Sequence, residues 1–144
     1  MVHNYSKGIF QGGSRTWDIK QDGRGVMYFA NNEGLITFDG KYWKRHTLPN
    51  HTIVRSIAID KNNRIYVGGQ GEFGYFEANS NNELAYVSLK ALLPKGHEQF
   101  ADAWNTVIVD HAVFFRTTQN IFEYRDDQIK VYPATVSWEF MGSA

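Results

Sequence analysis

The chain has 144 residues, of which 42% are hydrophobic and 15% aromatic, a composition that allows a hydrophobic core and excludes a disordered chain. Lysine plus arginine and aspartate plus glutamate both number 15, so the formal charge is zero and the basic excess typical of a nucleic-acid-binding protein is missing. The absence of cysteine excludes disulfides, thiolate chemistry and cysteine zinc sites. No apolar run reaches about 18 residues, so no membrane span is predicted.

The first predicted unit begins near Thr16 and contains four short strands. Asp22-Gly23 and Asp39-Gly40 predict tight hairpin turns, because glycine tolerates positive φ. The second strand is apolar at consecutive positions, which predicts that both of its faces are covered. The predicted strands are 16–22, 26–30, 35–38 and 42–47.

Two similar units follow along the chain. Their predicted strands are 54–60, 64–68, 73–76 and 84–88 in the second unit, and 105–110, 112–116, 121–124 and 128–132 in the third. Residues 89–103 between these units are less regular, and Leu89 to Leu93 are expected to form one helical turn that Pro94 ends. Near the C-terminus, Trp138-Glu139-Phe140 is similar to Trp17-Asp18-Ile19, which predicts the innermost strand of a fourth unit.

The units repeat with a period of about 40 residues, and four short strands per period are typical of a β-propeller blade. Equivalent positions recur in the three units: the aspartates Asp22, Asp60 and Asp110, and the aromatic residues Phe38, Phe76 and Tyr124. We therefore predict an all-β fold, a β-propeller segment with three four-stranded blades and the inner strand of a fourth. The predicted blades are 15–48, 54–88 and 104–133, with a connector at 89–103 and the next blade starting at 135–140.

Three blades do not close a ring, because propellers have about 4 to 8. The blade faces at the two ends are expected to be apolar, with Ile19, Met27 and Phe29 at one end and Val107, Val113 and Phe115 at the other. Such faces bind partners. We therefore expect either the remaining blades of a longer parent chain or a homodimer in which two chains stack end to end, exchanging strands from residues 4–10 and 136–140.

The first repeat also resembles a known family. The segment Asp22-Gly-Arg-Gly-Val-Met-Tyr-Phe-Ala-Asn-Asn-Glu-Gly-Leu-Ile-Thr-Phe-Asp-Gly-Lys-Tyr-Trp43 resembles the two-component regulator propeller repeat. Residues 60–76 match the same repeat with a variant ending. Residues 110–124 are a degenerate copy, with Arg116-Thr117 where the repeat has glycine. The resemblance covers most of residues 15–132.

This resemblance implies the extracytoplasmic sensor portion of a bacterial signalling protein, either a hybrid two-component system or a transcription regulator. It implies a periplasmic location and a non-catalytic role in ligand sensing. Several members recognise oligosaccharides, so the expected partner is a small molecule or an oligosaccharide. The opening residues, Asn4 through Trp17, resemble the start of a mature sensor after its signal peptide.

The candidate ligand-binding residues are Trp17, Arg55, Trp104 and Asn105. They occupy the predicted starts of the inner strands, and propeller sites usually lie there, at the mouth of the central channel. Tryptophan stacks on sugar rings, and arginine holds carboxylates with two hydrogen bonds. The alternative role is packing between blades, because Trp17 and Trp138 recur at equivalent places.

Other polar patterns predict ordinary structure. Asp60-Lys-Asn-Asn63 has a faint similarity to a calcium loop, but no bidentate glutamate follows and Arg64 would repel a cation, so we predict a turn. The Gly68-Gly69 pair does not open a helix, which argues against phosphate binding. The histidines do not form the two-histidine pair of a metalloprotease; they are His3, His46, His51, His97 and His111.

No serine lies in a nucleophile-elbow pattern, and the acids Glu33, Glu72 and Asp102 do not establish a carboxylate pair. We therefore predict no catalytic residue, no metal and no cofactor. Two alternatives to the sensor remain at this point. One is a fragment of a propeller lyase or hydrolase, and the other is a protein-interaction scaffold of the WD-repeat kind.

Overall fold

The structure, a computed structural model, describes residues 16–81, 83–96, 100 and 102–133. These residues form three four-stranded antiparallel sheets, each with its strands in sequence order. Blade 1 contains β1 (Thr16–Gln21), β2 (Met27–Asn31), β3 (Gly34–Phe38) and β4 (Trp43–His46). Blade 2 contains β5 (Val54–Ile59), β6 (Ile65–Gly69), β7 (Phe73–Ala78) and β8 (Leu84–Ser88). Blade 3 contains β9 (Asn105–Val109), β10 (Ala112–Arg116), β11 (Asn120–Arg125) and β12 (Gln128–Pro133).

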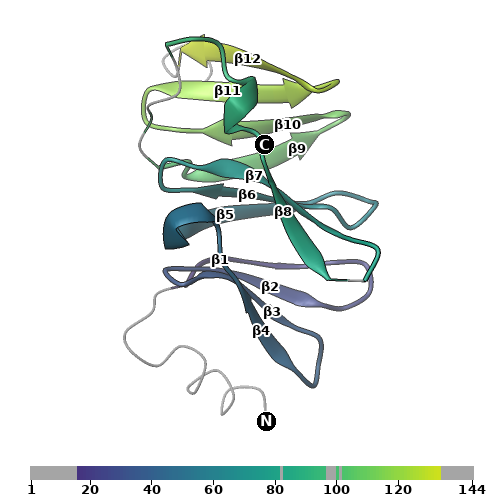
Figure 1. Cartoon of the computed structure of the whole chain (residues 1–144). Coiled ribbons are helices and arrows are strands. Elements are labelled where there is room, and N and C mark those ends of the chain that lie inside the picture. The colour runs from purple at the N-terminus through teal and green to yellow at the C-terminus, as the bar shows by residue number, and fades with distance from the viewer. Residues whose placement is uncertain (1–15, 82, 97–99, 101, 134–144) are drawn as a thin grey trace.

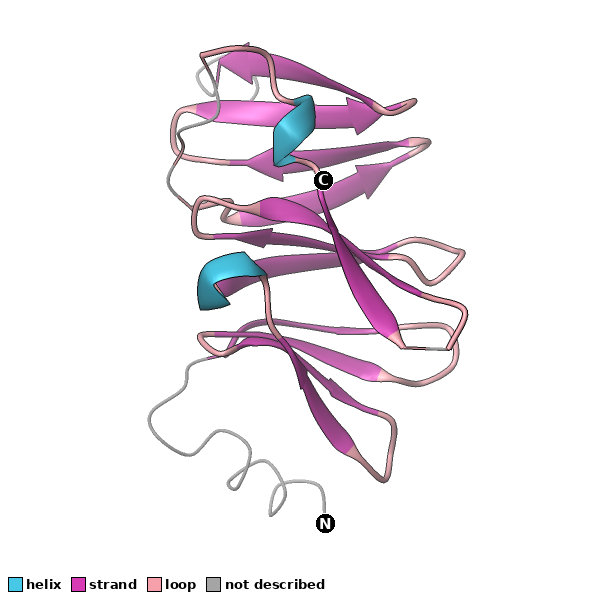
Figure 2. Ribbon diagram, in the orientation of Figure 1, coloured by secondary structure: helices cyan, strands magenta, loops and turns pink. Residues whose placement is uncertain are grey.

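The three sheets stack face to face in chain order, as Figure 1 shows. The first strands, β1, β5 and β9, are neighbours across the stack, whereas the outer strands β4 and β8 splay apart (Figure 2). This fan of sheets around a common inner edge is the arrangement of propeller blades. The predicted strand at 135–140 and the segment 4–10 lie outside the described residues.

The predicted turns form because aspartate side chains hold the backbone. In blade 1, Asp22 Oδ1 accepts the backbone N–H groups of Arg24 and Val26 at 2.8 and 3.1 Å. In blade 2, Asp60 Oδ1 accepts those of Asn62 and Arg64, each at 2.9 Å. The segment that resembled a calcium loop is therefore an Asx-type turn, as predicted.

The contact between blades 1 and 2 is mainly aliphatic. The strands of the two facing sheets supply small and branched side chains, and Tyr28 and Phe76 are the large members. Burying such apolar surface contributes about 25 cal/mol per Å². The buried cluster consists of Tyr28, Ala30, Leu35, Leu48, Val54, Ile57, Ile65, Val67 and Phe76.

The contact between blades 2 and 3 is mainly aromatic. Phe73 lies at its centre, with ring centroids 4.7 Å from Phe115 and 5.2 Å from Phe122. The connector between the blades also packs here, through Leu89 and Leu93. These two leucines flank the 3-10 helix η2 (Lys90–Leu92), which lies where one helical turn was predicted, whereas η1 (Pro49–His51) joins blades 1 and 2.

The face of blade 3 that points away from blade 2 differs from the prediction. Val113 and Phe115 were expected on that outer face, but they are buried against blade 2 in the aromatic cluster. The outer face instead carries Ala112, Phe114 and Ile121. The prediction was wrong because both faces of β10 are apolar, so the pattern alone does not distinguish them.

Candidate functional site

Irregularities at the starts of two inner strands place the first candidate residues. The pairing register shifts between Thr16 and Asp18 in β1, and between Val54 and Ser56 in β5. Trp17 and Arg55 are therefore the residues at the two shifts, at equivalent positions in their blades. A β-bulge changes the direction of a side chain and is common beside binding sites.

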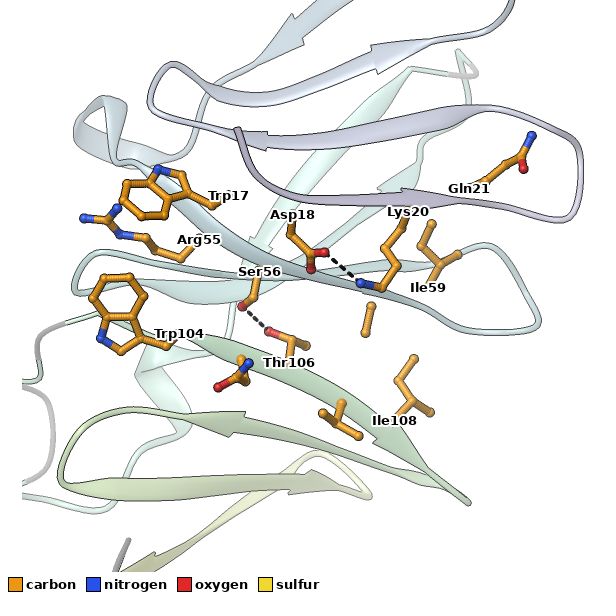
Figure 3. A pocket seen from close by; sticks show the side chains of 13 residues that line it. Trp17, Asp18, Lys20, Gln21, Arg55, Ser56, Ile59, Trp104, Thr106 and Ile108 are labelled. Carbon is orange, nitrogen blue, oxygen red and sulfur yellow. Dashed lines mark hydrogen bonds and ion pairs between the residues drawn. The ribbon is translucent and has the colours of Figure 1, made fainter. Parts of the chain in front are cut away.

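Three of the four candidate residues form one cluster: Trp17 belongs to blade 1, Arg55 to blade 2, and Trp104 directly precedes β9 of blade 3. The Arg55 guanidinium carbon lies 4.0 Å from the ring centroid of Trp17 and 4.7 Å from that of Trp104. The two indole rings are 5.9 Å apart and meet edge to face. Figure 3 shows the arginine side chain extending between the two tryptophans. Cation–π contacts of this kind contribute about 0.5–2 kcal/mol each.

Asp102, in the connector, fixes the arginine from one side. Its Oδ1 accepts a hydrogen bond from Arg55 Nε at 3.0 Å, and the two side chains are only 15% and 10% exposed. The other end of the guanidinium is different, because Nη1 is buried and has no hydrogen-bond partner among the described residues. A buried donor without an acceptor costs about 1–3 kcal/mol.

The fourth candidate, Asn105, is exposed and lies beside this cluster. Its Oδ1 accepts a hydrogen bond from Arg116 Nε at 2.6 Å. Burial lowers the pKa of Arg116 from its ordinary value. Trp17 is held in a similar way, because its Nε1 donates to Asn32 Oδ1 at 2.8 Å. Asn32 and Arg116 were not predicted from the sequence as neighbours of the site.

A cleft of about 560 Å³ runs along the inner strands from this cluster (Figure 3). All four candidate residues line it, together with polar side chains of β1, β5 and β9. Beside the cleft, one hydrogen bond joins β1 to β5 and another joins β5 to β9, so both connect neighbouring blades. Asp18 Oδ2 accepts the N–H of Ile57 at 3.0 Å, and the hydroxyls of Ser56 and Thr106 are 2.7 Å apart.

Close approach of the connector to blade 2 explains the Gly68-Gly69 pair. A Cβ atom on Gly68 would lie 2.6 Å from Ser56 Oγ and 2.8 Å from Ala103 Cβ. A Cβ on Gly69 would lie 2.5 Å from the carbonyl oxygen of Ile53. The Ala103 N–H donates to the Gly69 carbonyl at 2.8 Å. The glycines therefore let the connector deliver Asp102 and Trp104 to the cleft.

The remaining polar candidates lie elsewhere in the described part of the chain. Glu33 pairs with Arg45, and Glu72 accepts a hydrogen bond from Ser88, so neither is paired with Asp102. His46 lies between strands, with its Nε2 3.2 Å from the Thr37 hydroxyl. His3 and His97 lie outside the described residues.

The described ranges show neither a cluster of metal ligands nor a helix that could cross a membrane. No three His, Asp or Glu side chains there gather as metal ligands would. None of the helices in those ranges combines the length and apolarity required to cross a membrane.

Comparison with known proteins identifies the fold. A family model described as a beta-propeller repeat matches residues 47–73. The extracellular domain of BT4673 from B. thetaiotaomicron is similar in structure, with a TM-score of 0.64 and 16% identity over 85% of this chain. A protein of unknown function from Bacteroides caccae has a TM-score of 0.56 and 13% identity over 85% of the chain. The chain is a β-propeller segment.

The similar proteins are longer than this chain, which covers 16% of the BT4673 domain and 47% of the B. caccae protein. BT4673 is described as a proposed one-component system in one structure and as a proposed hybrid two-component system in another. No curated protein has a significantly similar sequence. The predicted β-propeller repeat is thus confirmed at the level of the repeat and the fold.

Proposed function

We propose that this chain is a ligand-sensing, non-catalytic part of the extracytoplasmic β-propeller of a bacterial signalling protein. The fold supports this role, because the structurally similar BT4673 domain is extracellular and is described as part of a signalling system. Fold alone does not determine function, so the residues of the site carry the proposal. The ligand lies in the cleft along β1, β5 and β9.

One observation carries the proposal: the inner strands of blades 1 and 2 and the entry to blade 3 each contribute one side chain to a single cluster. Trp17, Arg55 and Trp104 meet within 6 Å of one another. The cluster lies at the end of an open cleft of about 560 Å³, within the size range of ligand sites. A ligand bound there would contact residues from all three blades.

Packing between blades is the alternative role of the same residues, and their contacts with one another are consistent with that role. The tryptophans contact Arg55, and Asp102 neutralises the arginine. Two features favour ligand contact in addition to packing. The cluster borders the cleft, and the Arg55 Nη1 lacks an acceptor among the described residues.

A ligand screen tests the proposal directly. Glycans and small metabolites are added to the chain, and the melting temperature is followed. A ligand at 100 times its dissociation constant is expected to stabilise the fold by about 2.7 kcal/mol. Trp104→Ala is expected to abolish that stabilisation, with a small change in the melting temperature of the unliganded protein.

A matched tryptophan provides the control. Trp43 lies in blade 1, stacked on Phe38 with ring centroids 4.4 Å apart, and does not line the cleft. Trp43→Phe is expected to leave ligand binding unchanged. Loss of binding in both variants, or a large loss of stability in Trp104→Ala without ligand, would show that these residues act through packing.

Two further observations test the rest of the proposal. Chemical conversion of the bound ligand, followed by NMR, would contradict a non-catalytic role. The extracytoplasmic location is tested by fractionating cells that express the parent gene, with recovery in the cytoplasm as the contradicting result.

A further inference from the structure

The Arg55 guanidinium has more hydrogen-bond donors than its surroundings satisfy. Arginine carries five N–H donors and no acceptor. Within the described residues Asp102 takes only the Nε donor, at 3.0 Å, and Nη1 has no acceptor although the side chain is 10% exposed. The end of the guanidinium formed by the two Nη atoms is therefore positioned but incompletely bonded.

The two tryptophans restrict how a ligand can approach this end. Their rings lie 4.0 and 4.7 Å from the guanidinium carbon (Figure 3). An acceptor is therefore directed to the edge of the guanidinium. That edge presents parallel N–H groups, a geometry that fits the two oxygens of a carboxylate or another oxyanion. A neutral oxygen forms a weaker bond with the same donors.

The two carboxylates closest to the site each have a cationic partner already. The carboxylate of Asp18, which also lines the cleft, is already engaged by Lys20 Nζ at 2.8 Å and by two backbone N–H groups. Asp102 accepts from the Nε side of Arg55, and Nη1 at the other end has no acceptor among the described residues. Removal of a buried carboxylate charge beside an anion site strengthens anion binding, because like charges repel.

We infer that the ligand of this site carries a carboxylate or another oxyanion, which binds the Nη edge of Arg55 between Trp17 and Trp104. This inference rests on the proposed function, because it names the ligand class of the same cleft. Arg55 is the specificity-determining residue, and the tryptophans position it and contact the part of the ligand next to the anion.

Two matched pairs of probes test the inference with the complete chain. D-glucuronate is compared with D-glucose, and benzoate with benzyl alcohol, so that each pair differs mainly in the carboxylate. The indole N–H signals of Trp17 and Trp104 are followed by NMR during each titration. We expect saturable shifts with at least one anion and binding at least tenfold weaker for its neutral counterpart. Failure of both anions to bind overturns the inference.

Three variants locate the anion. Arg55→Lys keeps the charge but removes the paired N–H groups, and Arg55→Gln removes the charge as well; both are expected to weaken anion binding at least tenfold. Asp102→Asn keeps the acceptor for Nε and removes the negative charge, so it is expected to strengthen binding several-fold. Unchanged anion affinity in Arg55→Lys and Arg55→Gln, or unchanged or weaker affinity in Asp102→Asn, contradicts the inference. Indole spectra without ligand show whether each variant keeps its fold.

The outcomes separate this inference from the proposed function. A neutral ligand from the screen that shifts the Trp104 signal, with the same affinity in Arg55→Gln, overturns the anionic class and leaves the sensor role intact. If no ligand of any charge shifts either indole signal, both proposals are contradicted.

Discussion

The two contacts between adjacent blades have the same strand arrangement but different chemistry. The first buries aliphatic side chains such as Leu35, Ile57 and Val67, whereas the second stacks aromatic rings around Phe73. Their hydrogen bonds also differ. A carboxylate, Asp18, joins blades 1 and 2, and a pair of hydroxyls joins blades 2 and 3. Equivalent positions in a repeat can therefore do the same task with different residues.

The second contact, between blades 2 and 3, also holds the connector in place, whereas the first does not. The connector packs on it through Leu89, Leu93 and Phe100 and then continues to Asp102 and Trp104. The aromatic contact therefore supports the segment that places Asp102 and Trp104 in the candidate site. Its disruption should affect the site as well as stability, whereas disruption of the aliphatic contact should affect mainly stability.

The largest expected effect comes from removing a central ring. Phe73 is fully buried, and Phe73→Ala is expected to lower the free energy of unfolding by about 4 kcal/mol. Leu35→Ala, in the aliphatic contact, is expected to cost about 3 kcal/mol because fewer atoms are removed. Urea unfolding measures both.

Tyr42→Ala is the control for these two variants, because Tyr42 is 60% exposed and its loss is expected to cost less than about 0.5 kcal/mol. A larger loss for Leu35→Ala than for Phe73→Ala would mean that the aliphatic contact is the stronger one. The indole signals of Trp17 and Trp104 should move in Phe73→Ala and stay in place in Leu35→Ala.

A glycine substitution tests the route by which the connector reaches the site. Gly68→Ala places a Cβ atom within 2.8 Å of Ser56 and Ala103, so we expect a loss of about 1–3 kcal/mol and displaced Trp104 resonances. Gly23→Ala is the matched control, since its nearest neighbour is Asn63 at 3.9 Å. Equal effects of the two substitutions would show that the close approach does not position the site.

Much of this organisation could be predicted from the sequence. The recurrence of short strands at about 40 residues predicts the blades, and Asp22-Gly23 and Asp39-Gly40 predict two hairpins of blade 1. Trp17, Arg55 and Trp104 could be selected because the starts of inner strands meet near the axis. Their placement in one cluster agrees with that selection, while ligand binding by them stays a prediction.

Other features depended on spatial relations that strand patterns do not contain. Asp102 lies in an irregular connector, whose path no periodicity specifies. Gly68-Gly69 was the available signal, because adjacent glycines in a strand indicate close approach of another backbone. The orientation of Val113 and Phe115 was missed for a related reason: alternation separates the faces of a strand, but it does not say which face meets which blade when both are apolar.

A smaller effect is expected from the hydrogen bonds that join the blades. Asp18→Ala leaves the Ile57 N–H without its acceptor, so we expect a loss of about 2 kcal/mol. Ser56→Ala removes a neutral hydroxyl pair, and a loss of about 1 kcal/mol is expected. Thermal and urea unfolding of both variants test the order. The reverse order would show that the hydroxyl pair is the stronger connection.

The smallest expected effect is a pH dependence confined to the first contact. His46 lies against Phe76, with ring centroids 6.0 Å apart, and burial together with nearby Lys44 lowers the pKa of this imidazole. A histidine whose pKa is depressed by folding favours the folded state fully above its unfolded pKa, near 6.5, and loses that contribution as the pH falls below this value. Stability should therefore decline as the pH falls below about 6.5.

His46→Gln should flatten this decline, because glutamine keeps a polar partner for the Thr37 hydroxyl but does not titrate. His111→Gln is the control, since His111 is exposed in the β9–β10 turn. The Asp22 carboxylate does not contribute to this decline, because it titrates at lower pH. Burial opposes ionisation of that carboxylate, but hydrogen bonds from Tyr28, Arg24 and Val26 outweigh it and lower its pKa. Parallel pH profiles for the wild type and His46→Gln would show that the pKa of this imidazole is the same in the folded and unfolded states. Acid would then not weaken the aliphatic contact through His46.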